Sequence, residues 1–341
     1  MRGWVISSWG ERPRLTEIPD PLPDDGEVLV RVEACGVGLT VLNCIRGDLG
    51  NSSADLPRVP GHELVGRIVE VGPGVPSSRI GERVAAYFYL FCGRCRQCLR
   101  GAESLCEHLA GFVGVNRDGG YAPLVALPSE NAISLPEALD PVSATVVPDA
   151  VTTAVHVARL AAIAVGDRVA VIGAGGGVGV HMVQVAGLHG AEVAALEVTE
   201  EKLAYLDSQL GVAAVDSSDL EAVRLPAMWG GRCDVAVDFV GTRASLTWAL
   251  SVLGQGGRLV AMTTFPGIDF PVTPRELVFR QVSILGSRYG SRHEADLAAR
   301  LVAARRLEPV VGACVPPDDV ESLHERLRQG TLLGRGAILW G

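Results

Sequence analysis

Four cysteines fall within fifteen residues, at a spacing that suits a metal ion. The pattern is Cys92-x2-Cys95-x2-Cys98-x7-Cys106, set among Gly, Arg and Gln. Four thiolates can surround one Zn²⁺ tetrahedrally, although Cys-x2-Cys-x2-Cys also opens iron–sulfur sites. The long gap to the fourth cysteine, with no proline after it, favours zinc. Because four thiolates leave no open coordination position, the sequence predicts a structural zinc.

A glycine-rich run indicates a second binding function. The segment RVAVIGAGGGVGVHMVQVA covers residues 168–186 and is expected to form a buried strand, a turn and a helix. Bare backbone lets a pyrophosphate approach the N-terminus of such a helix, where free N–H groups favour anions. A simple tight turn is the alternative, but the flanking strand and helix supply the context of a dinucleotide site. The turn residues predicted to bind cofactor are Gly173, Gly175, Gly176, Gly177, Val178 and Gly179.

An acidic residue follows the glycine turn at the distance expected for ribose recognition. Glu197 ends the next predicted strand, eighteen residues after Gly179. A carboxylate there can accept both ribose hydroxyls and repels a 2′-phosphate, which favours NAD over NADP. Lys202 is the chain's only lysine and follows five residues later, close enough to help hold the ribose. Solvated charges at a helix start are the alternative interpretation of both residues.

A histidine–glutamate pair, His62-Glu63, is the third candidate site. The stretch CGVGLTVLN, residues 35–43, precedes it by about twenty residues and is expected to form a loop. This stretch holds one thiol, one hydroxyl and one amide, but no side chain that normally carries a charge. Its composition is unusual for a loop that leads into groups suited to acid–base or metal chemistry.

The elements that position these residues change in character near Pro148. Before it, β-rich runs at 27–37, 64–72 and 83–89 are separated by turns. After it, strand and helix alternate, which predicts a parallel sheet covered by helices on both faces. The predicted helices cover 149–164, 179–190, 199–211, 243–254 and 292–306, and the predicted strands 168–173, 191–197, 234–241, 257–263 and 282–290.

Length and charge exclude several classes of function. At 341 residues the chain is long enough for two domains, and a net charge of −9 argues against a nucleic-acid partner. The N-terminus lacks a signal pattern, and no apolar run approaches the ~20 residues of a membrane span, so we expect a cytoplasmic protein without a membrane partner. In a reducing compartment, eight cysteines indicate metal ligands or buried thiols rather than disulfides.

Taken together, the motifs resemble the zinc-containing alcohol dehydrogenase branch of the medium-chain dehydrogenase/reductase superfamily. The resemblance spans the chain in order: PGHELVG at 60–66, the four cysteines, the glycine turn, DFVG at 238–241 and LGRGAILWG at 333–341. It implies an α/β fold, with a GroES-like β-barrel catalytic domain and a Rossmann doubly wound parallel sheet. The implied domains are 1–148 with a zinc lobe at about 90–108, 149–285, and 286–341 returning to the catalytic domain. It also implies a homodimer or homotetramer.

The resemblance explains why the stretch before His62 is so uncharged. In the family this region usually reads like GVCHTDLH, with a zinc-binding cysteine, a basic residue near the cofactor phosphates, an orienting aspartate and a proton-relaying histidine. Here Gly38 stands where the ligand cysteine would be, Leu39 replaces the basic residue, Val41 the aspartate and Asn43 the histidine. Only Thr40 matches, and its hydroxyl is expected to touch the substrate oxygen.

The rest of the family's catalytic site is better preserved. His62 and Glu63 are present, Asp149 falls where some relatives use a third zinc ligand, and Thr153 matches a cofactor-binding position. An N-cap role for Asp149 and a core role for His62 are the alternatives. Either the catalytic zinc is absent or weakly bound, or His62, Glu63 and Asp149 hold it in an unusual geometry. Cys35 and Cys44 lie too far along the chain to replace the missing ligand directly.

These considerations predict an NAD(H)-dependent oxidoreductase with one structural zinc and a doubtful catalytic zinc. Without a metal Lewis acid, the site suits an apolar carbonyl or an activated C=C or C=N substrate. One alternative is a zinc-dependent alcohol dehydrogenase with atypical ligands, and another is a non-enzymatic NAD-binding sensor or scaffold. The predicted catalytic residues are Thr40, His62, Glu63 and Asp149, and the predicted walls of an apolar substrate pocket are Leu39, Val41 and Phe88.

Overall fold

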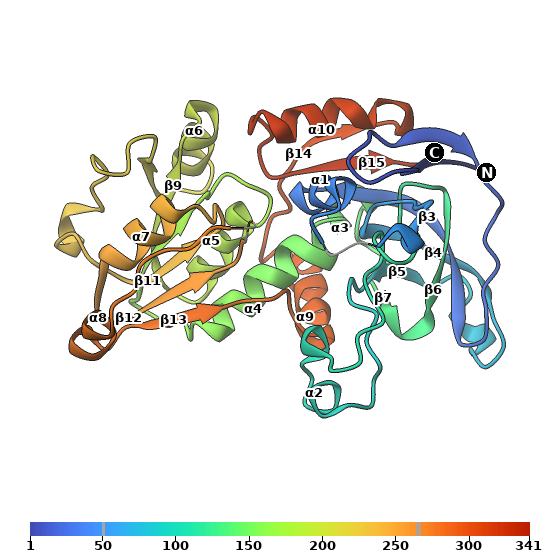
Figure 1. Cartoon of the computed structure of the whole chain (residues 1–341), viewed down its shortest axis with the longest axis horizontal. Coiled ribbons are helices and arrows are strands. Elements are labelled where there is room, and N and C mark those ends of the chain that lie inside the picture. The colour runs from blue at the N-terminus through green and yellow to red at the C-terminus, as the bar shows by residue number, and fades with distance from the viewer. Residues whose placement is uncertain (50–51, 264, 266) are drawn as a thin grey trace. The chain divides into compact units, whose positions relative to one another are not determined.

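The computed structural model describes residues 1–49, 52–263, 265 and 267–341, and divides the chain into two units (Figure 1). The first unit contains residues 1–152 and 290–341, and the second contains residues 153–289. Asp149 therefore belongs to the first unit, although the sequence analysis began the cofactor domain at that residue. The reason is that a π-helical turn, η5 (Val147–Val151), packs on helix α9 and on strands β4 and β5 of the first unit.

The first unit is built around a mixed sheet of seven strands in the order β14-β15-β3-β4-β5-β7, with β6 pairing on β3. Strand β14 runs parallel to β15, and the other neighbours are antiparallel. The separate hairpin-like pair β1 and β2 completes the strands of this unit. Their bounds are β1 (Arg2–Val5), β2 (Arg14–Glu17), β3 (Glu27–Val37), β4 (Glu63–Val71), β5 (Arg83–Ala86), β6 (Leu124–Pro128), β7 (Ala132–Ser134), β14 (Val311–Val315) and β15 (Arg335–Leu339).

Helices of the first unit are mostly short. They are α1 (Leu39–Arg46), α2 (Arg96–Leu99), α3 (Pro141–Ala144), α9 (Arg292–Ala303) and α10 (Val320–Arg328), with 3₁₀ turns η1 (Ser53–Asp55), η2 (Ser77–Arg79), η3 (Glu103–Leu105), η4 (Ser129–Asn131) and η7 (Pro317–Asp319). Helix α9 begins with a full capping box, in which Ser291 and Glu294 satisfy each other's backbone N–H groups. Helix α4 (Thr152–Leu160) leads into the second unit.

The second unit is a six-stranded parallel sheet in the order β10-β9-β8-β11-β12-β13. Numbered within the unit this order is 3-2-1-4-5-6, the doubly wound arrangement that binds dinucleotides where the strand order reverses. The strands are β8 (Arg168–Ile172), β9 (Glu192–Glu197), β10 (Ala213–Asp216), β11 (Cys233–Asp238), β12 (Leu253–Ala261) and β13 (Ser283–Gly286). The reversal lies between β8 and β11.

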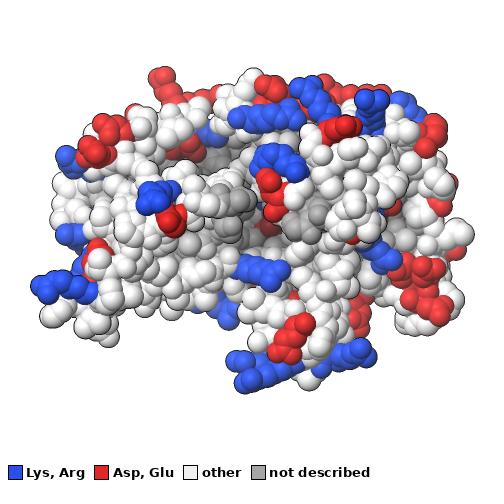
Figure 2. All heavy atoms as spheres, viewed as in Figure 1, with Lys and Arg blue, Asp and Glu red and all other residues white. Residues whose placement is uncertain are grey.

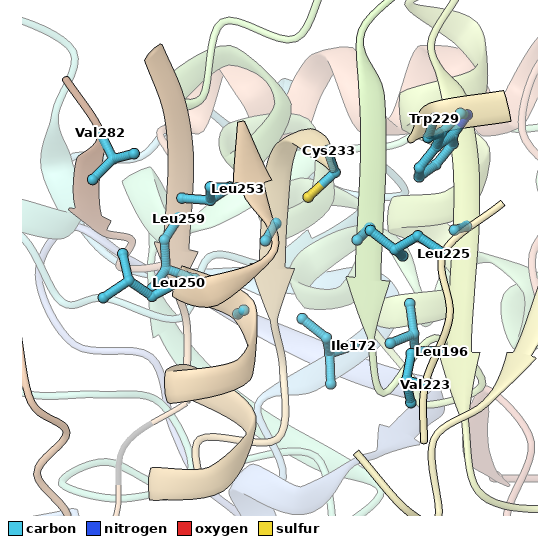
Figure 3. Close-up of a cluster of buried hydrophobic side chains, with 14 residues drawn as sticks. Ile172, Leu196, Val223, Leu225, Trp229, Cys233, Leu250, Leu253, Leu259 and Val282 are labelled. Atoms are coloured by element: carbon cyan, nitrogen blue, oxygen red, sulfur yellow. The ribbon is translucent and has the colours of Figure 1, made fainter. Parts of the chain in front are cut away.

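Helices and a buried apolar cluster hold this parallel sheet together. The helices are α5 (Gly179–Leu188), α6 (Glu200–Ser208), α7 (Arg243–Ser251) and α8 (Pro274–Arg280), with the 3₁₀ turn η6 (Ala227–Trp229). Figure 3 shows part of the core, in which side chains from the sheet meet Leu250 of α7 and Trp229. Burial of these apolar side chains is the main favourable contribution to the stability of this unit.

One local prediction was wrong. The stretch 35–43 is not a loop: it completes β3 and then, after Gly38, enters α1. Helix α1 buries Val41, Leu42, Cys44 and Ile45 on one face, so burial of this face outweighs the weak helix propensity of its β-branched residues. The alternation of strand and helix in the second unit was predicted correctly, apart from the short edge strand β10 and helix α8.

On the face drawn in Figure 2, basic side chains lie scattered among acidic ones rather than in one patch. Among the described residues, no helix is long and apolar enough to cross a bilayer.

Candidate functional site

The glycine turn of the second unit joins β8 to α5 with very little space for side chains. A Cβ on Gly179 would lie 2.9 Å from Ala174 Cα and would overlap the carbonyl oxygen of Gly173. The turn therefore needs glycine for close packing of the helix start against the strand end. This arrangement leaves backbone N–H groups at the start of α5, as a pyrophosphate site requires.

Glu197 at the end of β9 is bound directly to this turn. Its Oε2 accepts a hydrogen bond from the Gly175 N–H (2.9 Å), and its Oε1 accepts one from the Val198 N–H (2.8 Å). Lys202 is buried beside it, since a Cβ on Gly175 would lie 2.8 Å from the Lys202 side chain. Burial lowers the pKa of Lys202, and Glu197 opposes that shift. The carboxylate and the ammonium thus lie together at the carboxyl end of the sheet, where a doubly wound fold binds nucleotides.

The four cysteines form a ready tetrahedral site in the first unit. The sulfur–sulfur distances given by the structure are 4.0 Å for Cys92–Cys98, 3.5 Å for Cys95–Cys98 and 3.9 Å for Cys95–Cys106. A Zn–S bond of about 2.3 Å requires tetrahedral edges of about 3.8 Å. Backbone N–H groups of Cys98 and Glu107 point at the Cys95 sulfur and lower its pKa to about 6, which favours the metal-binding thiolate. These residues fit a zinc ion.

The second group of possible ligands is brought together by the strand register of the first unit. Strand β3 pairs Gly36 with Glu63 of β4. On its other side β3 pairs Val37 with Gly336 of β15, so Gly38 and Arg335 occupy the next opposed positions. Side chains of opposed residues lie on the same face of a sheet. The glycines at 36 and 38 consequently leave room for the side chains of Glu63 and Arg335.

Arg335 forms ion pairs with both carboxylates of this group. Its Nε lies 3.1 Å from Glu63 Oε2, and its Nη2 lies 2.5 Å from Asp149 Oδ2. His62 Nε2 lies 3.7 Å from Glu63 Oε1 and 3.6 Å from Asp149 Oδ2, with no hydrogen-bond partner among the described residues. Glu63 is fully buried, which raises its pKa, while the Arg335 charge opposes that shift. The positive charge of the Arg335 guanidinium therefore already offsets negative charge on the Glu63 and Asp149 carboxylates.

Position 38 shows how closely Arg335 approaches. An ideal Cβ on Gly38 would lie 2.7 Å from Arg335 Cζ and 3.0 Å from Glu63 Oε1, and it would overlap Arg335 Nη1. The backbone of Gly38 is extended, with φ −128° and ψ 178°, so any residue could adopt its conformation. Glycine is needed here for space, and the space is filled by the guanidinium.

The cysteines near in sequence do not replace the missing ligand. The Cys35 and Cys44 thiols point to the carbonyl oxygens of Gly36 (3.6 Å) and Gly114 (3.2 Å). In the described part of the chain, the possible metal ligands grouped at this site are His62, Glu63 and Asp149, whose donor atoms lie within 4.8 Å of one another. Asp149 lies inside η5, and its carboxylate binds the Arg335 guanidinium.

The other predicted site residues occupy different environments. Phe88 packs on His62 with ring centroids 4.4 Å apart, while Thr40 is half-buried in the first turn of α1. Leu39 is 51% exposed but Val41 is buried, so these two predicted pocket walls differ sharply in solvent exposure. Asn43, at the position of the relay histidine, accepts a hydrogen bond from Arg46. Thr153 is buried on α4.

Arg335 is the site residue that sequence analysis missed. It lies in the tail LGRGAILWG, which was noted only as a family motif. Its partners Glu63 and Asp149 lie far from it along the chain, and the pairing of β15 with β3 cannot be read from one sequence. The available signal was the pair of glycines two residues apart, since alternate positions of a strand face the same side.

Comparisons with known proteins agree with this architecture. Residues 24–137 match the alcohol dehydrogenase GroES-like domain, and residues 177–304 match the zinc-binding dehydrogenase domain. An alcohol dehydrogenase of Geobacillus stearothermophilus is 32% identical over 337 residues, covering 98% of both chains. The chain belongs to the zinc-type alcohol dehydrogenase family. The predicted family and fold class are thereby confirmed.

Further members of this family broaden the range of related activities. An alcohol dehydrogenase of Moraxella sp. is 33% identical over 99% of both chains, and an acryloyl-coenzyme A reductase of Metallosphaera sedula is 27% identical over 98% of both. Among solved structures, a thermostable alcohol dehydrogenase of Pyrobaculum aerophilum has a TM-score of 0.90 at 33% identity, covering 100% of this chain and 99% of its own. Acetophenone reductase of Geotrichum candidum, solved with NAD, has a TM-score of 0.88 at 28% identity, covering 99% and 97%. The chain is thus an oxidoreductase of the medium-chain family, and the sensor or scaffold alternative loses its support.

The two ligand groups of this alcohol dehydrogenase-like chain differ in how well they suit zinc. The cysteine lobe offers four thiolates at tetrahedral spacing. The other group offers three donors, but two of them are already paired with Arg335, and position 38 has no donor atom. As long as Arg335 holds this position, the second group does not fit a catalytic zinc.

Proposed function

We propose that this protein transfers hydride between NAD(H) and an apolar carbonyl or activated C=C or C=N substrate without a catalytic zinc. The observation that carries the proposal is the Arg335 guanidinium, which pairs with Glu63 and Asp149 beside the donor-free position Gly38. Lewis-acid activation is what zinc contributes to alcohol oxidation. A site without it suits substrates that are already electrophilic.

NAD is the proposed cofactor because of Glu197. Its carboxylate is fixed by backbone N–H groups of the turn, at the end of the strand after the glycine run. A carboxylate at this place favours ribose hydroxyls and repels a 2′-phosphate. The glycine turn would hold the pyrophosphate, and Lys202 and Thr153 would assist.

The reaction needs one hydride and one proton. Bound NADH would supply the hydride to the electron-poor carbon, and residues of the site would supply the proton that completes the reduction. The Thr40 hydroxyl and His62 Nε2 are the proposed donors, with the proton replaced from water. Phe88 packs against His62 and limits its motion, while Arg335 holds the neighbouring carboxylates in place.

A second candidate function has one specific observation in its favour. The donor atoms of His62, Glu63 and Asp149 lie within 4.8 Å of one another, so a zinc-dependent alcohol dehydrogenase with these ligands is the alternative. It would require Arg335 to leave both acids.

Isotope-traced turnover separates the two functions. Protein treated with dipicolinate, and checked to retain its lobe zinc, is given deuterated NADH with a conjugated enone, an aromatic enal, a cyclic imine and simple ketones. We expect deuterium at the electron-poor carbon of an activated substrate and turnover that does not depend on added zinc. Thr40→Val should slow turnover about 10²-fold or more, whereas the matched variant Thr16→Val on β2 should not. Turnover of the simple ketones only, and only after zinc is added, would support the alternative.

The assembly and location of the enzyme are also proposed. We expect a homodimer or homotetramer that acts on a small apolar molecule in the cytoplasm. All eight cysteines lie among the described residues and none is in a disulfide, which agrees with a reducing compartment. Light scattering of the purified protein gives the number of copies.

A further inference from the structure

The Arg335 guanidinium fills the space that a side chain at position 38 would need, and the resemblance puts the family's ligand cysteine at that position. We propose that Arg335 is the resident cation of this site and that it closes a latent divalent-metal site formed by His62, Glu63 and Asp149. The inference deepens the proposed function, because it explains why the enzyme would work without a catalytic zinc. It also predicts that one substitution restores metal binding.

The latent site has nearly the geometry of a metal centre. His62 Nε2 lies 3.7 Å from Glu63 Oε1 and 3.6 Å from Asp149 Oδ2. Zinc bonds of about 2.0–2.1 Å to nitrogen and oxygen require tetrahedral edges of about 3.3–3.4 Å. The two edges from His62 therefore need to close by only a few tenths of an ångström, and all three donor atoms lie within 4.8 Å of one another. Three protein ligands with one open position are the usual number for a catalytic zinc.

Unpaired buried atoms point to the same place. His62 Nε2 and both Glu63 carboxylate oxygens are buried and make no hydrogen bond within the described residues, although Glu63 is ion-paired. His62 is 4% exposed and Glu63 is fully buried. Buried polar atoms normally have partners, so atoms left without hydrogen bonds mark a place built for a cation or a ligand.

The guanidinium and a divalent ion compete for the same atoms. Asp149 Oδ2 is the oxygen nearest to His62 Nε2, and it is also the oxygen that Arg335 binds. Glu63 is held through its other oxygen at 3.1 Å. Two buried carboxylates need a positive partner, since isolated charges are very costly away from water. Because Arg335 already supplies that charge, a metal ion would gain less free energy by binding the two carboxylates.

The absence of a side chain at Gly38 is linked to the position of Arg335. A cysteine at this position would place its Cβ 2.7 Å from Arg335 Cζ, so the ligand and the guanidinium exclude each other in the observed position. Loss of the thiolate and occupation of its space by the guanidinium therefore belong together.

The test is the metal content of variants at position 335. Arg335→Met keeps the apolar stem and removes the charge, while Arg335→Lys keeps a cation. Each is purified without chelators, and zinc per chain is measured by plasma mass spectrometry. Arg83→Met, which removes a half-buried arginine from Glu33 elsewhere in the first unit, is the matched control.

We expect about two zinc ions per chain in Arg335→Met and about one in the wild type, Arg335→Lys and Arg83→Met. Adding His62→Ala to Arg335→Met should return the content to about one. Cobalt gives an independent readout. In cobalt-loaded Arg335→Met, the visible spectrum should contain the band of the ion in the cysteine lobe and a second band from an ion bound by nitrogen and oxygen ligands.

Folded Arg335→Met that holds about one zinc would overturn the inference while leaving the metal-free function intact. Two zinc ions in the wild type would overturn both. If Arg335→Met does not fold, cobalt titration of the wild type decides: saturation at the cysteine lobe supports the inference, and a second, non-thiolate cobalt spectrum refutes it.

Discussion

Replacing Gly38 by alanine is expected to destabilise the first unit, although its backbone suits any residue. With φ −128° and ψ 178° the position is ordinary extended chain, where alanine is normally better than glycine by about 0.5–1 kcal/mol. The added Cβ, however, would lie 2.7 Å from Arg335 Cζ. Carbon atoms in contact prefer about 3.5–4.0 Å, so the guanidinium must withdraw by about 1 Å.

The size of the effect depends on what happens to the ion pairs. Simple overpacking costs about 1–3 kcal/mol. If the guanidinium leaves Glu63, whose distance from Nε is now 3.1 Å, a fully buried carboxylate loses its partner, at a cost of about 3–5 kcal/mol. The protein will adopt the less costly response, so we expect a loss of about 1–3 kcal/mol in the free energy of unfolding.

A double-mutant cycle isolates the contact. Methionine at 335 ends before the position of Cζ, so in the Arg335→Met background Gly38→Ala should cost almost nothing. Native-state hydrogen exchange of peptides from β3 and β15 gives opening free energies for this part of the chain. Gly187→Ala on α5, where a Cβ meets nothing within 4 Å, measures the effect of the substitution without crowding. Additive effects of the two substitutions would show that Arg335 does not lie against position 38.

Three further predictions concern the cofactor turn, the core ion pair and the metal lobe. Glu197→Gln should raise the Kd for NADH roughly 10- to 100-fold, as expected for about 1.5–3 kcal/mol of charged hydrogen bonding, and calorimetry should show no such change for Glu192→Gln at the other end of β9. Arg168 donates to Asp234 and holds the pKa of that carboxyl below its ordinary 3.8, so the unfolded chain takes up this proton first as the pH falls. The resulting stability is present above pH 3.8 and lost below it. Arg168→Met should lower the free energy of unfolding by up to about 1 kcal/mol and should reduce the fall of the urea midpoint at acid pH. An unchanged fall of the midpoint would contradict this prediction. Cys98→Ser should empty the lobe, seen as loss of its zinc and as proteolytic cleavage within residues 90–108, and retention of the metal would refute the ligand assignment.

The fold of the second unit could be predicted because its signals are local. Strand and helix alternate along the chain, and the glycine turn between β8 and α5 has a recognisable composition. The same holds for the cysteine lobe, whose four ligands lie close together in sequence. Such features need no knowledge of which distant segments meet.

The candidate site of the first unit could be predicted only in part. His62, Glu63 and Asp149 were found by resemblance, and the loss of a ligand at position 38 was evident from the sequence. The role of Arg335 was not, since it depends on the register of β15 against β3. Helix α1 was missed because burial of one of its faces outweighs weak local preference. Sequence showed what was absent from the site but not what had taken its place.

The most direct test of the account is the zinc content of the wild-type protein, purified without chelators or added metal. The account predicts about one zinc per chain, bound by the four cysteines, with none at His62, Glu63 and Asp149. About two zinc ions per chain, with the second lost in His62→Ala, would contradict it and would show that Arg335 does not exclude the metal.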